Sequence, residues 1–230
     1  MSIGDGNNRM MGIQNVLDRI RQAEQQFNRP PGSVQLLAVT KGRDISLIRA
    51  AIAAGQRAFG ENYLQEALQK IQALADPALE WHFIGALQSN KTRAVAENFA
   101  WMHTINRFKI AQRLSQQRPA KLPPLNVCIE VNISKEVSKS GVPVEEIKDL
   151  ATQVRALPRL RLRGLMAIPR PVSDFSQQLS IYRQVYDLQQ QLIHQGFELD
   201  TLSMGMSNDF EAAIAAGSTL VRIGAAVFGH

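Results

Sequence analysis

The stretch Val34-Gln35-Leu36-Leu37-Ala38-Val39-Thr40-Lys41 is a short apolar run that ends in a lysine, and a helical pattern at residues 45–54 follows it. An apolar run of this length, bounded by polar residues, is typical of a buried strand in a βα unit. The same alternation recurs along the chain from residue 34 onward. The predicted strands cover residues 34–40, 57–60, 80–84, 101–104, 125–132, 161–167, 200–203 and 219–223.

Helical patterns separate these strands, and turn residues mark several junctions, such as Pro143 before one helix and Gly217 after another. Eight parallel strands with intervening helices close most economically as a single (β/α)8 barrel, the TIM barrel of the α/β class. An open doubly wound sheet is the alternative that the pattern leaves open. The predicted helices cover residues 11–27, 45–54, 63–74, 91–97, 107–117, 144–157, 175–195 and 209–216.

Length and composition favour one domain. The 230 residues are 45% hydrophobic, enough for a sizeable core. We therefore expect a barrel domain over residues 10–230, including the extra N-terminal helix, and no second domain. Residues 1–9 are expected to be a disordered leader without function, with the native start at Met10 or Met11. The single cysteine, Cys128, excludes an intrachain disulfide and is expected to be a small buried hydrophobe.

Charge and hydropathy narrow the classes of partner. The formal charge of +6 permits attraction to nucleic acid. However, the densest basic group, Arg155 to Arg163, lacks interleaved aromatic residues, so we expect a solvated surface, with weak nucleic-acid binding as the minority alternative. No stretch reaches the roughly 20 apolar residues that cross a bilayer. We expect a cytoplasmic protein with no membrane partner, and the lack of a clustered Cys, His or carboxylate set predicts no metal site.

Two late turns are candidates for binding an anion. In a barrel, active-site groups come from the carboxyl ends of the strands, and the turns after strands seven and eight often hold phosphate. Ser207 follows the seventh strand, and Gly224 and Ala225 follow the eighth. Ser207 can cap the next helix and present backbone amides, and the small residues let amides approach a ligand. An ordinary helix cap explains Ser207 equally well.

Strand parity links Lys41 to Arg222. Alternate residues of a strand share a face, so Lys41 belongs with Leu37 and Val39, and Arg222 belongs with Leu220. If both sets point inward, an amine and a guanidinium converge at the barrel mouth. A solvated lysine is the alternative for Lys41 taken alone.

Arg222 lies between two apolar residues and would be costly to bury without an acceptor. The structural alternative is an ion pair with Glu61 or Glu130. The expected convergence of Arg222 with the Lys41 amine at the barrel mouth favours a ligand over an ion pair as the partner of Arg222. A phosphate site, an arginine and an amine are together what pyridoxal 5′-phosphate requires as anchor, ring-nitrogen partner and covalent attachment point.

Six motifs in order resemble the signatures of the pyridoxal phosphate homeostasis protein family, from about residue 12 to the end of the chain. They are Leu37-Ala38-Val39-Thr40-Lys41, Phe59-Gly60-Glu61-Asn62-Tyr63-Leu64-Gln65-Glu66, Trp81-His82-Phe83-Ile84-Gly85-Ala86-Leu87-Gln88-Ser89-Asn90-Lys91, Gly164-Leu165-Met166-Ala167-Ile168, Leu202-Ser203-Met204-Gly205-Met206-Ser207-Asn208-Asp209-Phe210 and Val221-Arg222-Ile223-Gly224-Ala225-Ala226-Val227-Phe228-Gly229.

The resemblance implies a barrel similar to the barrel domain of alanine racemase, and it assigns the cofactor-binding residues. Many relatives carry threonine at the position of Ala225, so backbone amides would replace a hydroxyl contact to phosphate. His82 has the alternative of a satisfied core histidine. The implied roles are the internal aldimine with pyridoxal 5′-phosphate for Lys41, phosphate binding for Ser207, Gly224 and Ala225, the pyridine nitrogen for Arg222, the ring for Asn62, and the pocket lining for Met166 and His82.

The same resemblance implies a role in vitamin B6 and amino-acid homeostasis without demonstrated turnover and without catalytic residues. Apo-enzymes would be the recipients of the cofactor. Lys135 and Lys139 are in a Ser-rich loop, where we expect solvated side chains, and a role in receiving or passing on the aldehyde is the minority alternative. We expect a monomer. The alternative is a barrel-type pyridoxal phosphate enzyme, a racemase or decarboxylase. A racemase needs a base on each face of its substrate. In the racemases that this barrel resembles, an added β-domain supplies the second base, a tyrosine, and the tyrosines of this chain fall in predicted helices.

Overall fold

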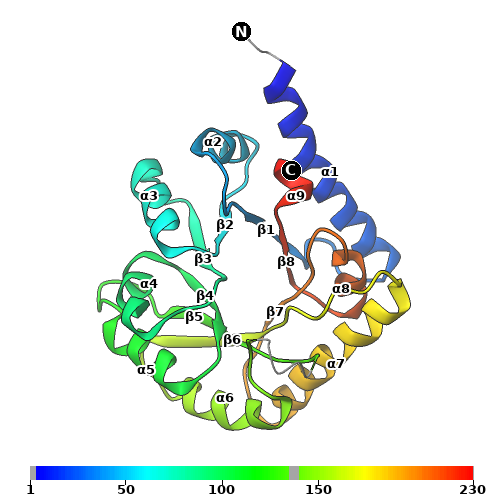
Figure 1. Cartoon of the computed structure of the whole chain (residues 1–230). Coiled ribbons are helices and arrows are strands. Elements are labelled where there is room, and N and C mark those ends of the chain that lie inside the picture. Colours follow the sequence, from blue (N-terminus) through cyan, green and yellow to red (C-terminus); the bar gives the residue numbers. More distant parts are fainter. Residues whose placement is uncertain (1–3, 135–139, 230) are drawn as a thin grey trace.

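Each apolar run predicted from the sequence forms one strand of a closed barrel (Figure 1) in a computed structural model that describes residues 4–134 and 140–229. The strands pair in parallel and in chain order, and β8 pairs with β1 to close the barrel. The predicted (β/α)8 barrel is confirmed and the open sheet is excluded. The strands are β1 Gln35–Val39, β2 Ala58–Glu61, β3 Glu80–Phe83, β4 Trp101–Ile105, β5 Leu125–Glu130, β6 Leu160–Met166, β7 Thr201–Ser203 and β8 Leu220–Ile223.

Helices cover the outside of the barrel. Short 3-10 turns at Ser89–Lys91 and Val144–Glu146 lead into two of them. The last helix was not predicted, because four residues are too few for a helical period to show. In the described residues the α-helices are α1 Gly4–Gln26, α2 Ile45–Ala53, α3 Leu64–Leu74, α4 Thr92–Asn98, α5 Phe108–Gln117, α6 Ile147–Arg155, α7 Phe175–His194, α8 Phe210–Ala216 and α9 Ala225–Phe228.

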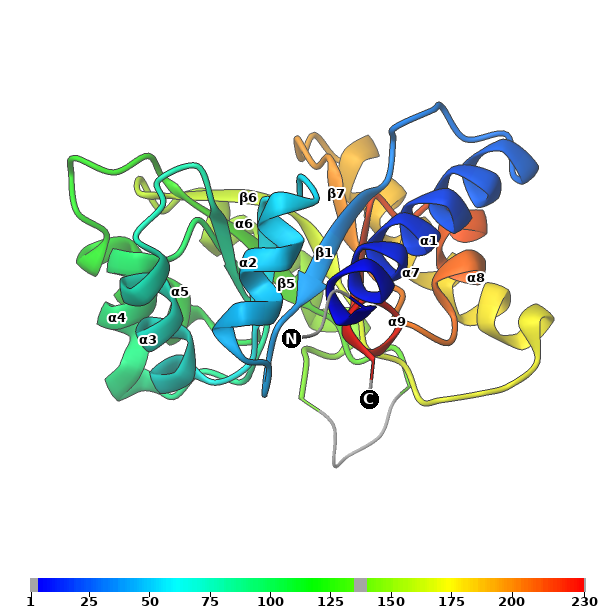
Figure 2. The ribbon, with the colours of Figure 1, turned by 90° about the horizontal axis from the view of Figure 1, so that it is seen from above.

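The extra N-terminal helix, α1, lies against α8 and α9 beside the barrel (Figure 2). Its apolar residues Ile13 and Val16, at helical spacing, are buried. The helix begins at Gly4, whereas the sequence predicted a helix from residue 11 and a disordered leader over residues 1–9. Once packing holds the later turns, each further helical residue adds a hydrogen bond at little cost, which accounts for the longer helix. Residues 1–3 lie outside the described part, and the boundary at residue 10 stays a prediction.

Side chains along β1 alternate between two cores. Leu36 and Ala38 join the large cluster between strands and helices, whereas Leu37 and Val39 join a smaller cluster inside the barrel. Leu37 lies opposite Arg222 in the β1–β8 register, and Arg222 is buried. The predicted inward parity of these two strands is therefore confirmed.

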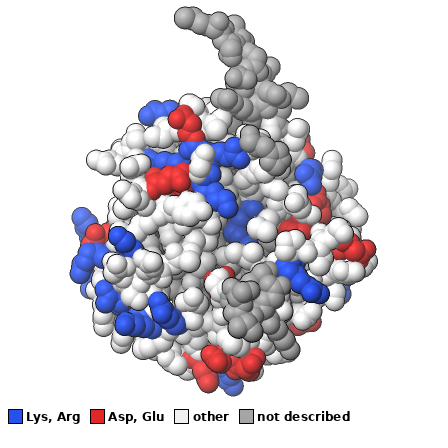
Figure 3. Space-filling view, viewed as in Figure 1, with Lys and Arg blue, Asp and Glu red and all other residues white. Residues whose placement is uncertain are grey.

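The carboxyl ends of the strands form the face that Figure 3 shows toward the viewer, and they lie along the lower edge of the molecule in Figure 2. Helix α9 lies at this edge, directly after β8. Lys and Arg side chains are visible at the centre of this face, where the barrel opens. None of the helices in the described residues is long and apolar enough to span a bilayer.

Candidate functional site

Lys41 lies two residues beyond the end of β1, in the turn that leads to α2, and its side chain is exposed. Gly42 follows with a φ of 67°, in the left-handed region that favours glycine, and Asp44 caps α2 by accepting a hydrogen bond from the Ser46 amide. The guanidinium of Arg43 donates to the carbonyl of Gly229. The turn that carries Lys41 is thus tied to the segment after α9.

Gly224 brings the start of α9 against β1. A Cβ added at Gly224 would lie 3.1 Å from the carbonyl oxygen of Val39, so a larger residue would push β1 away. Val227 donates the first hydrogen bond of α9, to the carbonyl of Gly224, so the amides of Ala225 and Ala226 precede the intrahelical ladder. These half-buried amides and Lys41 therefore border the same part of the mouth.

Ser207 is half-buried in the turn between β7 and α8. The prediction that Ser207 caps α8 is wrong, because Asp209 occupies the N-cap position. The Asp209 carboxylate instead accepts hydrogen bonds from the Met206 amide, at 2.7 Å, and from the buried Tyr182 hydroxyl, at 2.9 Å. With Asp209 holding the turn, the Ser207 hydroxyl is not required as a helix cap.

Arg222 is buried in the barrel interior, with 4% of its surface exposed. Its guanidinium donates to the Ser203 hydroxyl at 2.8 Å and to the Ala167 carbonyl at 2.9 Å. Burial lowers the pKa of Arg222 below its ordinary value. Of the two carboxylates considered as ion-pair partners, Glu61 pairs with Lys70 and Glu130 accepts from the Ser140 hydroxyl, while the charge of Glu130 raises the pKa of Arg222 against the larger effect of burial. A guanidinium has five N–H donors, so two bonds hold Arg222 and still permit donation to a ligand.

A chain of polar side chains crosses the barrel from Glu80 to Arg222. His82 Nε2 lies 2.8 Å from the Glu80 carboxylate, and His82 Nδ1 lies 2.9 Å from His103 Nε2. His103 Nδ1 lies 2.7 Å from the Ser203 hydroxyl, which in turn accepts from Arg222. The two charged ends fix the direction of every bond. Glu80 only accepts and Arg222 only donates, so two neutral imidazoles satisfy every bond of the chain when each carries its proton on Nε2.

We expect His103 to stay neutral well below the ordinary histidine pKa of about 6.5, and His82 to stay neutral below that value. Burial is the largest cause that lowers the pKa of each ring. Nitrogen NMR of the imidazoles from about pH 7.5 to about pH 5.5 should show both as Nε2–H tautomers throughout. A protonated ring, or an Nδ1–H tautomer, would contradict this hydrogen-bond chain.

The same pKa shifts have a consequence for stability. Below about pH 6.5 the histidines of the unfolded state become protonated, whereas the buried rings of the folded state stay neutral. The histidine contribution to the free energy of unfolding therefore falls as pH falls. Burial raises the pKa of Glu61 and of Glu130. Above the ordinary glutamate pKa, these two carboxyls lower the free energy of unfolding as pH rises, which is the opposite of the histidine effect. A pH profile of stability therefore mixes both effects, and the NMR titration is the measurement that isolates the histidines.

Asn62 is half-buried directly after β2, and its Oδ1 is a buried atom without a hydrogen-bond partner. An unsatisfied buried acceptor is costly in the protein alone. Gly85, after β3, approaches its backbone so closely that an added Cβ would lie 2.0 Å from the Asn62 carbonyl oxygen. The position of Asn62 at the mouth is therefore fixed by its neighbour on the next strand.

Met166 and His82 lie at different depths of the barrel. Met166 ends β6 beside Ser203 of β7 and is buried with Trp101 and Cys128. His82 stacks on Trp101, and His103 and Ser203 separate it from Arg222. The satisfied core histidine describes His82 as it is placed, and its direct contact with a cofactor stays a prediction.

Several further expectations can be placed. Cys128 is buried, and burial raises the pKa of its thiol to about 12, so it is an unreactive hydrophobe. Tyr63 is exposed at the N-cap of α3, whereas the sequence predicted it as the first residue of that helix. Within residues 4–134 and 140–229, no group of three or more potential ligands is arranged to hold a metal. Lys135 and Lys139 lie outside the described residues.

The structure thus gathers residues from β1, β2, β7 and β8 at one mouth, with Lys41, Asn62, Ser207 and Gly224 around it and Arg222 beneath. Sequence reasoning missed His103 and Ser203. Strand parity offered a signal for His103, because it shares a face of β4 with Trp101. No local signal joined Ser203 to a histidine 100 positions away.

Comparisons with known proteins agree with this geometry. Residues 13–230 match the alanine racemase N-terminal domain family. A curated relative from Pseudomonas aeruginosa, named pyridoxal phosphate homeostasis protein, is 56% identical over 217 residues that cover 94% of this chain and 93% of the relative. A relative of the same name from Escherichia coli K12 is also 56% identical, over 93% of each chain.

Solved structures extend the likeness to the fold. PipY of Synechococcus elongatus, solved with PLP bound, is 35% identical with a TM-score of 0.80, over 91% of this chain and 100% of PipY. Alanine racemase from Corynebacterium glutamicum, at 19% identity and a TM-score of 0.67, shares the fold over 94% of this chain and 60% of the racemase. The chain belongs to the pyridoxal phosphate homeostasis protein family.

Proposed function

We propose that the protein binds pyridoxal 5′-phosphate at the barrel mouth and acts in vitamin B6 and amino-acid homeostasis. One observation carries the proposal. The β1–β8 pairing, together with the approach of Gly224 to Val39, brings an exposed amine, a buried guanidinium and the amides at the start of α9 to one end of the barrel. The proteins of this name and the PLP-bound PipY support the choice of cofactor.

The residues present fit the chemical groups of this cofactor. The phosphate would be held by the Ser207 hydroxyl and by the amides at Gly224 and Ala225, where close backbone approach is possible. The Asn62 Oδ1, a buried acceptor without a partner, would lie beside the ring. Arg222 would donate to the pyridine nitrogen while Ser203 and Ala167 hold it.

Lys41 would hold the cofactor covalently. Its exposed amine would supply the nitrogen of a covalent bond to the aldehyde carbon, and the aldehyde oxygen would leave as water. When bound, the cofactor can act as an electron sink for carbanion chemistry. A guanidinium only donates, so Arg222 would keep the ring nitrogen unprotonated and would weaken that sink.

The second candidate function is amino-acid racemisation or decarboxylation on the same site. The exposed Tyr63, next to Asn62, is the observation that favours it. Against it, the Tyr182 hydroxyl is bonded to Asp209, and burial raises its pKa above the ordinary value, which makes it a poor base. We therefore propose a carrier without turnover, whose recipients are apo-enzymes.

A transfer assay tests the proposed function. Protein loaded with one pyridoxal phosphate per chain is mixed with a purified apo-enzyme that requires this cofactor. We expect the apo-enzyme to gain activity while the carrier loses its bound cofactor, and we expect no interconversion of L- and D-amino acids by the carrier alone. Sustained racemisation or decarboxylation that Tyr63→Phe abolishes would instead establish the enzyme.

A further inference from the structure

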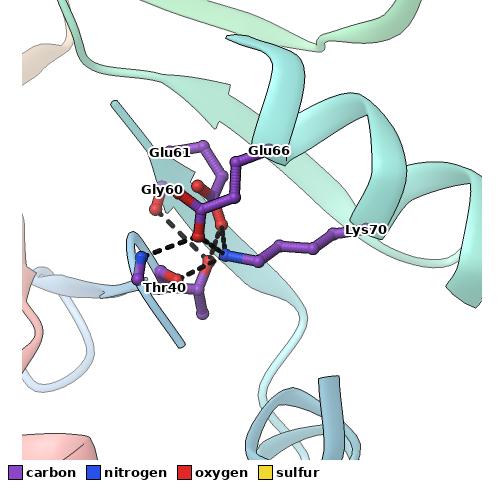
Figure 4. A network of polar contacts seen from close by, with 6 residues as sticks. Thr40, Gly60, Glu61, Glu66 and Lys70 are labelled. Atoms are coloured by element: carbon purple, nitrogen blue, oxygen red, sulfur yellow. Dashed lines mark hydrogen bonds and ion pairs between the residues drawn. The ribbon is translucent and has the colours of Figure 1, made fainter. Parts of the chain in front are cut away.

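Lys70 is a buried lysine behind the wall of the barrel that carries Lys41. It lies on α3 with 4% of its surface exposed, and its Nζ faces β2 and the end of β1 (Figure 4). The ammonium donates to the carbonyl of Thr40 at 2.6 Å, to Glu61 Oε1 at 2.8 Å and to Glu66 Oε1. These three acceptors satisfy the three N–H donors of a lysine.

The cluster of Lys70, Glu61 and Glu66 bonds to the residues directly before and after Lys41. Lys70 holds the Thr40 carbonyl, one residue before Lys41, and Glu66 Oε1 accepts from the amide of Gly42, one residue after it, at 2.7 Å. The Thr40 hydroxyl also donates to Glu61. The backbone on both sides of Lys41 is thereby fixed, while the Lys41 side chain stays exposed.

Fold stability alone does not account for this arrangement. Burying an ammonium and a carboxylate carries a desolvation cost that their attraction often fails to exceed, and apolar replacements are frequently neutral or stabilising. Here Glu61 is fully buried and its Oε2 has no hydrogen-bond partner. Because the bonds are directed at the Thr40 carbonyl and the Gly42 amide, the cluster fixes the turn rather than filling the core.

We infer that Lys70 is a positioning residue for Lys41: through Thr40, Glu61 and Glu66 it holds the turn in the orientation from which the Lys41 amine reaches the cofactor aldehyde. The inference rests on the proposed function. Asn62 directly follows Glu61, so the same lysine also steadies the residue expected beside the ring.

The test compares two ligands on Lys70→Met, which removes the charge and keeps the length of the side chain. Pyridoxal 5′-phosphate can bond to Lys41, whereas pyridoxine 5′-phosphate, with a hydroxymethyl group in place of the aldehyde, can only bind noncovalently. We expect the preference for the aldehyde over the alcohol, the ratio of their dissociation constants, to fall at least about tenfold, because a small misplacement of a reacting group is costly. Affinity for the alcohol should change little.

Two further variants separate positioning from loss of fold. Arg118 is another buried cation, which donates to the carbonyls of Ala96, Phe99 and Pro123 on the opposite side of the barrel from Lys41. Arg118→Met should lower thermal stability and leave the ligand preference unchanged. Glu66→Ala removes the contact to the Gly42 amide from a partly exposed side chain, and it should also lower the preference for the aldehyde. This variant keeps the test available if Lys70→Met does not fold.

The outcomes distinguish the inference from the proposal beneath it. If the wild-type protein shows no preference for the aldehyde, the proposed covalent function fails. If the wild type shows the preference, and both Lys70→Met and Glu66→Ala keep it or weaken both ligands equally, then Lys70 has only a structural role and the inference is overturned.

Discussion

Replacing Lys41 by alanine is expected to abolish the covalent attachment of pyridoxal phosphate and the visible absorption band that accompanies it. The free energy of unfolding should change by less than about 0.5 kcal/mol, as for most exposed side chains away from special features. The reason is the position of Lys41, whose side chain is exposed beyond β1 while neighbouring residues hold the turn. Absorbance spectra of the two proteins after incubation with the cofactor, together with denaturant unfolding, measure both effects.

Lys121→Ala is the matched control, because Lys121 is also exposed but lies in the segment that leads into the amino end of β5. It should retain the absorption band at full intensity. A Lys41→Ala protein that keeps the band and remains folded would show that another amine carries the cofactor, and the assignment of Lys41 would be wrong.

Gly85→Ala is expected to damage both the fold and the site. The added Cβ would lie 2.0 Å from the carbonyl oxygen and 2.9 Å from the Cα of Asn62. Both are backbone atoms, so the overlap is relieved only by moving the end of β2. We expect a loss of about 1 to 3 kcal/mol in the free energy of unfolding, as for other overpacked sites. Cofactor affinity should fall at least about tenfold, because Asn62 is displaced from the mouth.

Gly196→Ala tests whether instability alone could weaken binding. Gly196 has a φ of 88°, and an added Cβ would meet no atom within 4 Å. Alanine there should cost about 1 to 2 kcal/mol through backbone strain and leave cofactor affinity unchanged. Calorimetric titration of both variants decides the point. Equal affinities for Gly85→Ala and the wild type would contradict the role given to the contact between Gly85 and Asn62.

The barrel could be predicted because each βα unit has its own local sequence pattern. An apolar run such as Leu36 to Val39, followed by a polar turn and a helical period, needs no knowledge of distant residues. The predictions that were wrong concern ends and short elements. The start of α1 at Gly4 and the four-residue α9 leave no periodic signal.

The polar interior was harder to predict because its partners are distant in the chain. Arg222 was expected to meet a ligand or a carboxylate, yet Ser203 and the Ala167 carbonyl hold it. That choice depends on which side chains the register places across the barrel. Strand parity groups His103 with Trp101, but their strand is buried on both faces, so the sequence does not show that this face points inward.

Lys70 shows the same limit from the outer side of the barrel. In sequence it is a lysine four residues after Glu66 on a helix, the pattern of an ordinary exposed ion pair. Its burial follows from the packing of α3 against β2, where Glu61 points outward and Thr40 directly follows the neighbouring strand β1. Only the assembled fold shows that this pair flanks Lys41.

Borohydride reduction followed by peptide mass spectrometry tests the central claim most directly, because it fixes the C=N bond as a stable amine and identifies the residue that carries it. The protein is incubated with pyridoxal 5′-phosphate, reduced and digested. We predict that the mass of the reduced cofactor appears on the peptide that contains Lys41, at about one per chain. Modification of a different lysine, or no modification with the cofactor in excess, would contradict the account.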